Sequence, residues 1–169
     1  MKMSKEFQKE FKRLYTEMAT LCENEEGVGD PFSYGRAKEI LTSIELEHEI
    51  SETLSGADGI DHNGACEYKA TSGKNISGTY NGISVQPTWE DQEKYLKEEK
   101  LGKYENHYIC RFEGGRGIVE IWKLSGEDVL TILLPKLKNK YSTVLTKKDP
   151  RLGASLTKKD ITKYGICLR

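Results

Sequence analysis

The chain has no apolar run long enough to cross a membrane, and charged residues stand at the N-terminus where a secretory signal needs an apolar stretch. The cysteines are few and form no CxxC pair: Cys22, Cys66, Cys110 and Cys167. Their spacing argues against a zinc knuckle and predicts reduced, partly buried thiols. No repeat or low-complexity tract is present. We expect a cytoplasmic protein with no membrane partner, in which 169 residues form one domain with a substantial core.

The chain also has no large excess of charge of either sign, since its formal net charge is −1. Such a value argues against binding nucleic acid through total charge. The distribution is uneven, however, because from residue 136 onward ten basic residues are opposed only by Asp149 and Asp160, an excess of about +8. Residues 39–67 are instead rich in Glu and Asp, as a cation site requires. A basic arm beside an acidic centre suits a metal-dependent nuclease, and a solvated basic surface without a partner is the alternative.

The most informative stretch, residues 56–69, combines a turn signal with acidic and basic residues. Asn63-Gly64 favours a two-residue hairpin turn, because both central residues of a type I′ turn need positive φ. If His62 pairs with Ala65 across that turn, then Asp58, Glu67 and Lys69 share one face of the hairpin.

Asp61 is the competing acidic residue. It lies closer to the turn than Asp58, but a two-residue loop puts it on the opposite face with the side chain of Tyr68. A three-residue loop would reverse that choice. The two-residue turn therefore favours Asp58 and leaves Asp61 as the alternative.

Two carboxylates and an ammonium on neighbouring strands suit phosphodiester hydrolysis. Carboxylates are hard oxygen ligands for Mg²⁺, which also keeps waters and takes substrate phosphate oxygens. Lys69 can orient or deprotonate the attacking water, or offset the charge that develops on phosphorus, while the metal acidifies the water. An exposed, salt-bridged hairpin without chemistry is the alternative.

Asp58 followed by Glu67-Tyr68-Lys69 resembles the motif of the PD-(D/E)xK nuclease superfamily, an Asp on one strand and Glu-x-Lys on the next. The stretch is most similar to small type II restriction endonucleases of the PvuII kind, and the likeness extends loosely from Gly56 to the C-terminus. The interval from Asp58 to Glu67 is one residue shorter than in that kind. Residues 71–88 contain no histidine, so its recognition sequence does not carry over.

The resemblance implies a restriction-endonuclease-like α/β fold, with a mixed central β-sheet flanked by helices. It assigns catalysis to Asp58, Glu67 and Lys69, and the Mg²⁺ ligands to Asp58, Glu67 and the backbone carbonyl of Tyr68. It also implies a homodimer on double-stranded DNA, which fits palindromic sites, and a cognate DNA methyltransferase that need not bind this chain.

The rest of the chain divides around that hairpin. Residues 1–55 predict two helices, at 4–23 and 33–51, which we expect to form a dimer contact. Residues 56–124 predict the catalytic sheet, including adjacent antiparallel strands at 107–112 and 118–124 and a charged helix at 89–100. The basic region 125–169 predicts a helix from Ser125 to about Tyr141, kinked or divided by Pro135, and a short helix capped by Thr157 and ended by Gly165.

Candidate DNA contacts come from two segments. The Ser-, Thr-, Gly- and Asn-rich segment 70–87 predicts a loop or short ribbon that reads base edges, although a mobile surface loop explains it as well. Basic residues of the C-terminal region would hold phosphates. The candidates are Asn75, Thr79, Asn81, Ser84 and Gln86 for bases, and Lys147, Lys148, Arg151, Lys158 and Lys159 for phosphates.

Three functions compete on these observations. The first is a Mg²⁺-dependent, sequence-specific endonuclease of type II restriction kind, which leaves 5′-phosphate and 3′-hydroxyl ends. The second is a repair or junction-resolving nuclease that selects DNA structure. The third is a DNA-binding protein without catalysis.

Overall fold

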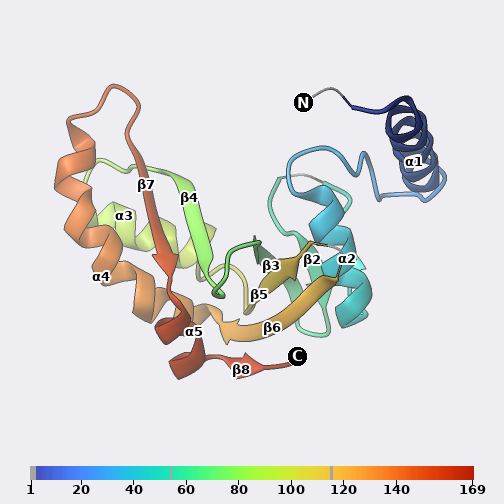
Figure 1. Cartoon of the computed structure of the whole chain (residues 1–169). Coiled ribbons are helices and arrows are strands. Elements are labelled where there is room, and N and C mark those ends of the chain that lie inside the picture. The colour runs from blue at the N-terminus through green and yellow to red at the C-terminus, as the bar shows by residue number, and fades with distance from the viewer. Residues whose placement is uncertain (1–2, 54, 115) are drawn as a thin grey trace.

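A six-stranded mixed sheet lies at the centre of the fold (Figure 1). The computed structural model describes residues 3–53, 55–114 and 116–169. In chain order its elements are α1 (Lys5–Glu23), α2 (Arg36–Leu46), β1 (Glu49–Ile50), β2 (Gly59–Asp61), β3 (Gly64–Thr71), β4 (Gly78–Ser84), α3 (Trp89–Tyr95), the π-helix η1 (Leu96–Lys100), β5 (Asn106–Glu113), β6 (Gly117–Ser125), α4 (Gly126–Leu145), β7 (Arg151–Leu156), α5 (Lys158–Tyr164) and β8 (Ile166–Cys167). Among the helices of these ranges, none has the length and apolar character needed to cross a bilayer.

The strand order of the central sheet is β1-β2-β3-β5-β6-β8. Only β3 and β5 pair in parallel, and their neighbours are antiparallel. A second sheet pairs β4 with β7, so the predicted ribbon segment is a strand whose partner lies far along the chain. The predicted α/β class with a mixed central sheet is confirmed, as is the antiparallel pair β5–β6. The sheet is wider than the predicted range 56–124, because β1 and β8 form its edges.

The two faces of the central sheet pack against different layers. Ile109 and Leu124 join the main core, which the sheet shares with β4, β7, α4 and α5. Residues of alternate positions on β3 and β5 instead pack against Leu46 at the end of α2. Because Lys69 is in register with Ile109 in the parallel pair, Lys69 and Glu67 lie on the face toward β4.

Local side-chain caps explain where the helices begin. Ser125 accepts a hydrogen bond from Asp128 N, and Thr157 forms a full capping box with Asp160, both as predicted. The sequence predicts that Pro135 kinks or divides α4; division is wrong, since the 20-residue helix Gly126–Leu145 runs through Pro135, and the kink stays a prediction. Proline removes one helical hydrogen bond. Its neighbours Leu133 and Leu137 are fully buried and hold the helix against the core.

Two other helices end differently from the prediction. Helix α2 is shorter than the predicted 33–51, because Glu47 adopts a left-handed conformation (φ 55°) and the chain then enters β1. The charged helix 89–100 is confirmed as α3, but its last turn is π-helical, with Leu101 N donating to Leu96 O at 2.8 Å. This wide turn carries Lys100 to the rim of the cleft described below.

His107 joins the two sheets. Its side chain is fully buried on β5, with Nε2 donating to Leu101 O and Nδ1 accepting from the Tyr80 hydroxyl, both at 2.9 Å. Burial lowers the pKa of His107 to about 4, and the nearby charge of Lys69 acts in the same direction. The neutral ring is therefore a bridge between β5, β4 and the segment after η1.

This bridge predicts a pH-dependent stability. Above the ordinary histidine pKa of 6.5 the ring is neutral in both folded and unfolded chains. Between pH 6.5 and about 4 the unfolded chain binds a proton that the folded chain does not. The free energy of unfolding therefore decreases as the pH is lowered through this window, and its contribution from His107 levels off below about 4. In urea titrations across this window, the decline should be shallower for His107→Gln than for the wild type. Equal declines for the two proteins would contradict the assignment of this pH dependence to His107.

Candidate active site

The hairpin that carries the site turns one residue earlier than predicted. Asp61 pairs with Gly64, so the two loop residues are His62-Asn63, and the predicted pairing of His62 with Ala65 is wrong. Asp61 Oδ1 accepts a hydrogen bond from Asn63 N at 2.7 Å, which closes the turn at this point. Positive φ is taken by Gly64 alone within the turn.

The shift does not change which side chains share a face. Both the predicted and the observed loops contain two residues, so inward and outward positions are preserved. The Asp58 carboxylate approaches β3, where its Oδ2 accepts from Tyr68 N at 2.7 Å. Asp58, Glu67 and Lys69 are therefore brought together, as the face argument predicts.

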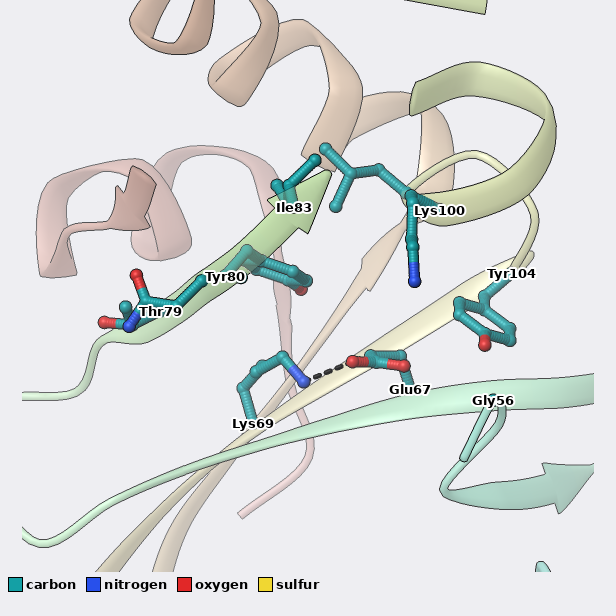
Figure 2. A pocket seen from close by; sticks show the side chains of 11 residues that line it. Gly56, Glu67, Lys69, Thr79, Tyr80, Ile83, Lys100 and Tyr104 are labelled. Carbon is teal, nitrogen blue, oxygen red and sulfur yellow. Dashed lines mark hydrogen bonds and ion pairs between the residues drawn. The ribbon is translucent and has the colours of Figure 1, made fainter. Parts of the chain in front are cut away.

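Lys69 Nζ is the point on which the oxygens of the site converge. It donates to Glu67 Oε1 in a close ion pair (Figure 2) and to Tyr68 O at 3.0 Å, and it lies 3.9 Å from Asp58 Oδ2. These three oxygens are the ones assigned to Mg²⁺ from sequence. They already surround a single cation, so their arrangement fits a small hard ion that prefers oxygen ligands.

Tyr68 holds this arrangement through its backbone, while its side chain points to the opposite face. There the hydroxyl lies 2.9 Å from His48 Nδ1 and 3.3 Å from Ser43 Oγ. A side chain at Gly59 would overlap the Tyr68 ring, so the glycine of β2 is needed for the ring to lie against the strand. The anchored ring fixes the amide and carbonyl that contact Asp58 and Lys69.

Asp61 instead holds the hairpin turn against β5 through hydrogen bonds. Its carboxylate is buried and accepts hydrogen bonds from Asn106 Nδ2 at 2.7 Å and from the Tyr108 hydroxyl at 2.8 Å, besides the turn amide. Burial opposes ionisation, but these hydrogen bonds outweigh it and lower the pKa of Asp61. The geometry thus groups Asp58, and not Asp61, with Glu67 and Lys69.

The two site carboxylates are held in a poorly solvated environment. Burial raises the pKa of Asp58 and of Glu67, and the positive charge of Lys69 opposes this only in part. Proximity of the two acids raises the pKa of Glu67 further. A divalent cation would favour the ionised forms of both carboxyls and so offset this cost of burial.

A cleft of about 330 Å³ opens above Glu67 and Lys69, and Asp58 lies outside its lining. Glu67 and Lys69 form its floor, and β4 supplies Thr79 and Asn81, two of the predicted base contacts. Lys100 and Tyr104 enter from the segment after α3 and point toward Glu67 (Figure 2). Neither was found from sequence, because Lys100 is placed by the π-helical turn η1 and Tyr104 by the irregular segment between η1 and β5, and neither has a local sequence signal.

A third carboxylate, Glu39 on α2, was also missed. Burial and the charge of nearby Asp58 raise its pKa. Arg36, itself almost fully buried, pairs with Glu39 at 3.3 Å and also donates to three backbone carbonyls. Helix α2 therefore brings the Glu39 side chain near Asp58. The sequence around Glu39 indicates only a helix, so it did not mark this residue as part of the site.

A basic groove of about 550 Å³ continues from the cleft, and the two share Asn81 and Gly82. The register of β4 on β7 is interrupted between Tyr80 and Ile83, which places Asn81-Gly82 in a bulge, with Gly82 at φ 69°. Lys140, Lys147 and Arg151 line the groove, and none of its described lining residues is acidic. Two of the predicted phosphate contacts, Lys147 and Arg151, thus line the groove together with Lys140, which was not predicted.

The remaining predicted contacts are scattered. Ser84 Oγ accepts from Arg151 at 3.2 Å, and the backbone of Gln86 is held by Gln92 and Tyr141. Neither side chain lines the cleft or the groove. The others are exposed and also lie outside both: Asn75 in the loop before β4, Lys148 in the turn before β7, and Lys158 and Lys159 in the first turn of α5.

The residues of the site would suit Mg²⁺ only as a site with few protein ligands. In the part of the chain that the structure describes, no three His, Cys, Asp or Glu side chains gather as a ready metal cage. Mg²⁺ commonly takes one or two carboxylates and completes its shell with water and phosphate. Asp58, Glu67 and the Tyr68 carbonyl satisfy that requirement.

Comparison with known proteins adds no relative, since no protein-family profile and no curated protein sequence matches the chain. Function is therefore inferred from the residues of the site and their geometry.

Metal affinity and stability should respond differently to substitution of Asp58 and of Asp61. Asp58→Asn should weaken Mn²⁺ or Mg²⁺ binding at least about tenfold, because a charged oxygen ligand is lost, with little change in the midpoint of urea unfolding. Asp61→Asn should leave metal affinity near wild type but destabilise the fold, since charge-assisted hydrogen bonds contribute about 1.5–3 kcal/mol each. Calorimetric titration and urea unfolding measure both effects. The reverse pattern would place the metal on Asp61.

Proposed function

We propose that this chain is a Mg²⁺-dependent double-strand DNA endonuclease of the PD-(D/E)xK, type II restriction kind. The observation that carries the proposal is the convergence of Asp58, Glu67 and the Tyr68 carbonyl on Lys69 Nζ, since Lys69 and Glu67 form the floor of an open cleft. A salt-bridged hairpin without chemistry would be expected at an exposed surface. Here both carboxylates are mostly buried, and their pKa values are raised.

The residues divide the work of hydrolysis. When bound, Mg²⁺ acidifies a water molecule and polarises the scissile phosphate. Asp58, Glu67 and the Tyr68 carbonyl hold the ion. Lys69, released from those oxygens, orients the attacking water and offsets charge on the phosphoryl oxygens. Attack at phosphorus with departure of the 3′-oxygen gives a 5′-phosphate and a 3′-hydroxyl.

DNA is the substrate that fits the surroundings of the site. The groove with Lys140, Lys147 and Arg151 meets the catalytic cleft at Asn81, so a phosphate backbone held in the groove leads to the reacting centre. Asn81 and Thr79 are exposed on β4 beside small residues, which lets a base edge approach their polar atoms. The mixed sheet flanked by helices is compatible with the restriction-endonuclease-like architecture.

Cleavage of unmethylated plasmid DNA tests the proposal. The wild type should give discrete fragments with Mg²⁺ and none with EDTA. Asp58→Asn and Lys69→Met should each lower the rate at least about a hundredfold, since each removes a group needed in the transition state. Lys9→Met, on α1 and distant from the cleft, is the matched control and should cut normally.

Other outcomes of the same assay identify the alternatives. Preference for branched over linear DNA would indicate a structure-selective repair or junction-resolving nuclease. Binding in EDTA without cleavage under any metal would indicate a DNA-binding protein whose acidic pair is structural. Normal cleavage by Asp58→Asn would remove the site assignment.

The basic groove makes a separate prediction for binding. Lys140→Ala, Lys147→Ala and Arg151→Ala should each weaken DNA affinity for all sequences alike and reduce the slope of log K against log salt by about 1, because each removes one phosphate contact. Lys158→Ala and Lys159→Ala, which alter charge equally outside the groove, are the matched controls. Fluorescence anisotropy with Ca²⁺ or EDTA measures this without cleavage. Equal losses in both groups would show a diffuse charge effect.

A further inference from the structure

The Lys69 ammonium has an aromatic neighbour besides the oxygens that surround it. Its Nζ lies over the ring of Tyr80, 5.2 Å from the ring centroid. Tyr80 projects from β4 above Lys69 and Glu67 and lines the cleft (Figure 2). A cation within about 6 Å of an aromatic face is attracted to it, more strongly when the pair is withdrawn from water. Tyr80 is 5% exposed and the Lys69 side chain 21%, so this contact is largely sheltered from water.

The position of the Tyr80 ring is fixed independently of Lys69. Its hydroxyl donates to His107 Nδ1 at 2.9 Å, and the two rings meet edge to face with centroids 5.6 Å apart. Gly78, two residues earlier on β4, lets the strand approach the central sheet closely. A Cβ at Gly78 would lie 3.0 Å from Ile109 Cδ1 and 3.5 Å from Lys69 Cβ. The ring is therefore held over the ammonium by the backbone of β4 and by a buried histidine.

A neutral ring suits this position better than an acidic side chain. Burial, together with the charges of Glu67 and Asp58, raises the pKa of Tyr80 well above its usual value of 10, so the phenol stays protonated. A carboxylate here would offer Mg²⁺ another hard oxygen ligand and would compete with the site for the ion. The aromatic face instead attracts an ammonium without supplying such a ligand.

We propose that Tyr80 is a positioning residue whose ring holds the Lys69 ammonium when a divalent cation takes the oxygens around it. The inference rests on the proposed function and names a residue that acts through Lys69. Without the ring, the released ammonium would remain in a poorly solvated cleft with no partner, which is costly. On the ring, only one side of the ammonium is occupied, so its N–H groups can reach the attacking water and the phosphoryl oxygens.

Nuclear magnetic resonance of lysine-labelled protein tests this contact without cleavage. Protons above an aromatic face are shifted upfield, and the Lys69 ε-methylene signal is identified by its loss in Lys69→Met. In the wild type this signal should be upfield before Mg²⁺ is added and should move further upfield with Mg²⁺. Tyr80→Phe should show both shifts, and Tyr80→Leu should show neither. Both variants lose the hydrogen bond to His107, so the comparison isolates the ring.

Cleavage kinetics test whether the contact serves the reaction. Tyr80→Leu should cut plasmid DNA on the order of tenfold more slowly than Tyr80→Phe, through kcat and not KM, because the lost attraction positions Lys69 only after DNA is bound. Tyr80→Met fills the space without an aromatic face and should resemble Tyr80→Leu. Fluorinated phenylalanine at position 80 keeps the ring shape but weakens its negative face, so its rate should fall between those of Tyr80→Phe and Tyr80→Leu. Urea unfolding checks that each variant is folded.

The outcomes distinguish the role of Tyr80 from the nuclease itself. A Lys69 signal that moves downfield when Mg²⁺ binds would overturn the role of Tyr80 and leave the metal site standing. Equal kcat for the phenylalanine, fluorinated and leucine proteins would do the same. A wild type that binds no Mg²⁺ would overturn both the metal site and this role. Mg²⁺ binding with the upfield shift, but with no cleavage of any DNA, would contradict the nuclease alone.

Discussion

The hydrogen bond from Tyr68 N to Asp58 is the contact on which the site depends. It draws a carboxylate from the end of β2 onto β3, where Glu67 and Lys69 already share a face. Two acids that are mostly withdrawn from water repel each other and resist ionisation. The ammonium of Lys69 compensates this repulsion, and the Tyr68 ring, anchored at His48 and Ser43 on the far face, keeps the backbone in place. The pairing of the hairpin therefore brings together the oxygens of the proposed cation site.

The second sheet gives that site a cleft and a surface. Tyr80 of β4 reaches His107 on the central sheet, and this buried pair sets how far β4 lies from Lys69. The bulge at Asn81-Gly82 then opens the wall of the cleft toward the groove lined by Lys140 and Arg151. The proposed cation site lies beside the cleft, and the cleft adjoins the basic groove at Asn81 and Gly82. That order is what hydrolysis of a polyanion requires.

Local patterns predicted the core of this arrangement, and long-range contacts account for what they missed. The shared face of Asp58, Glu67 and Lys69 follows from the two-residue period of strands, so it persists although the turn lies one residue earlier. The turn itself is decided by Asp61, whose partners Asn106 and Tyr108 are more than forty residues away in sequence. Pairing of β4 with β7 and the π-helical placement of Lys100 likewise depend on tertiary packing. A helix at 4–23 was predicted, but only the fold shows that the apolar side chains of α1 are exposed.

The central claim is that the oxygens now gathered around Lys69 Nζ hold a divalent cation. Its most direct test is a crystal structure of the protein with Mn²⁺, using anomalous scattering to locate the ion. The account predicts an anomalous peak bonded to Asp58, Glu67 and the Tyr68 carbonyl, with the Lys69 side chain displaced toward the cleft. A peak bonded to Asp61, or no peak at saturating Mn²⁺ with Lys69 still paired to Glu67, would contradict it.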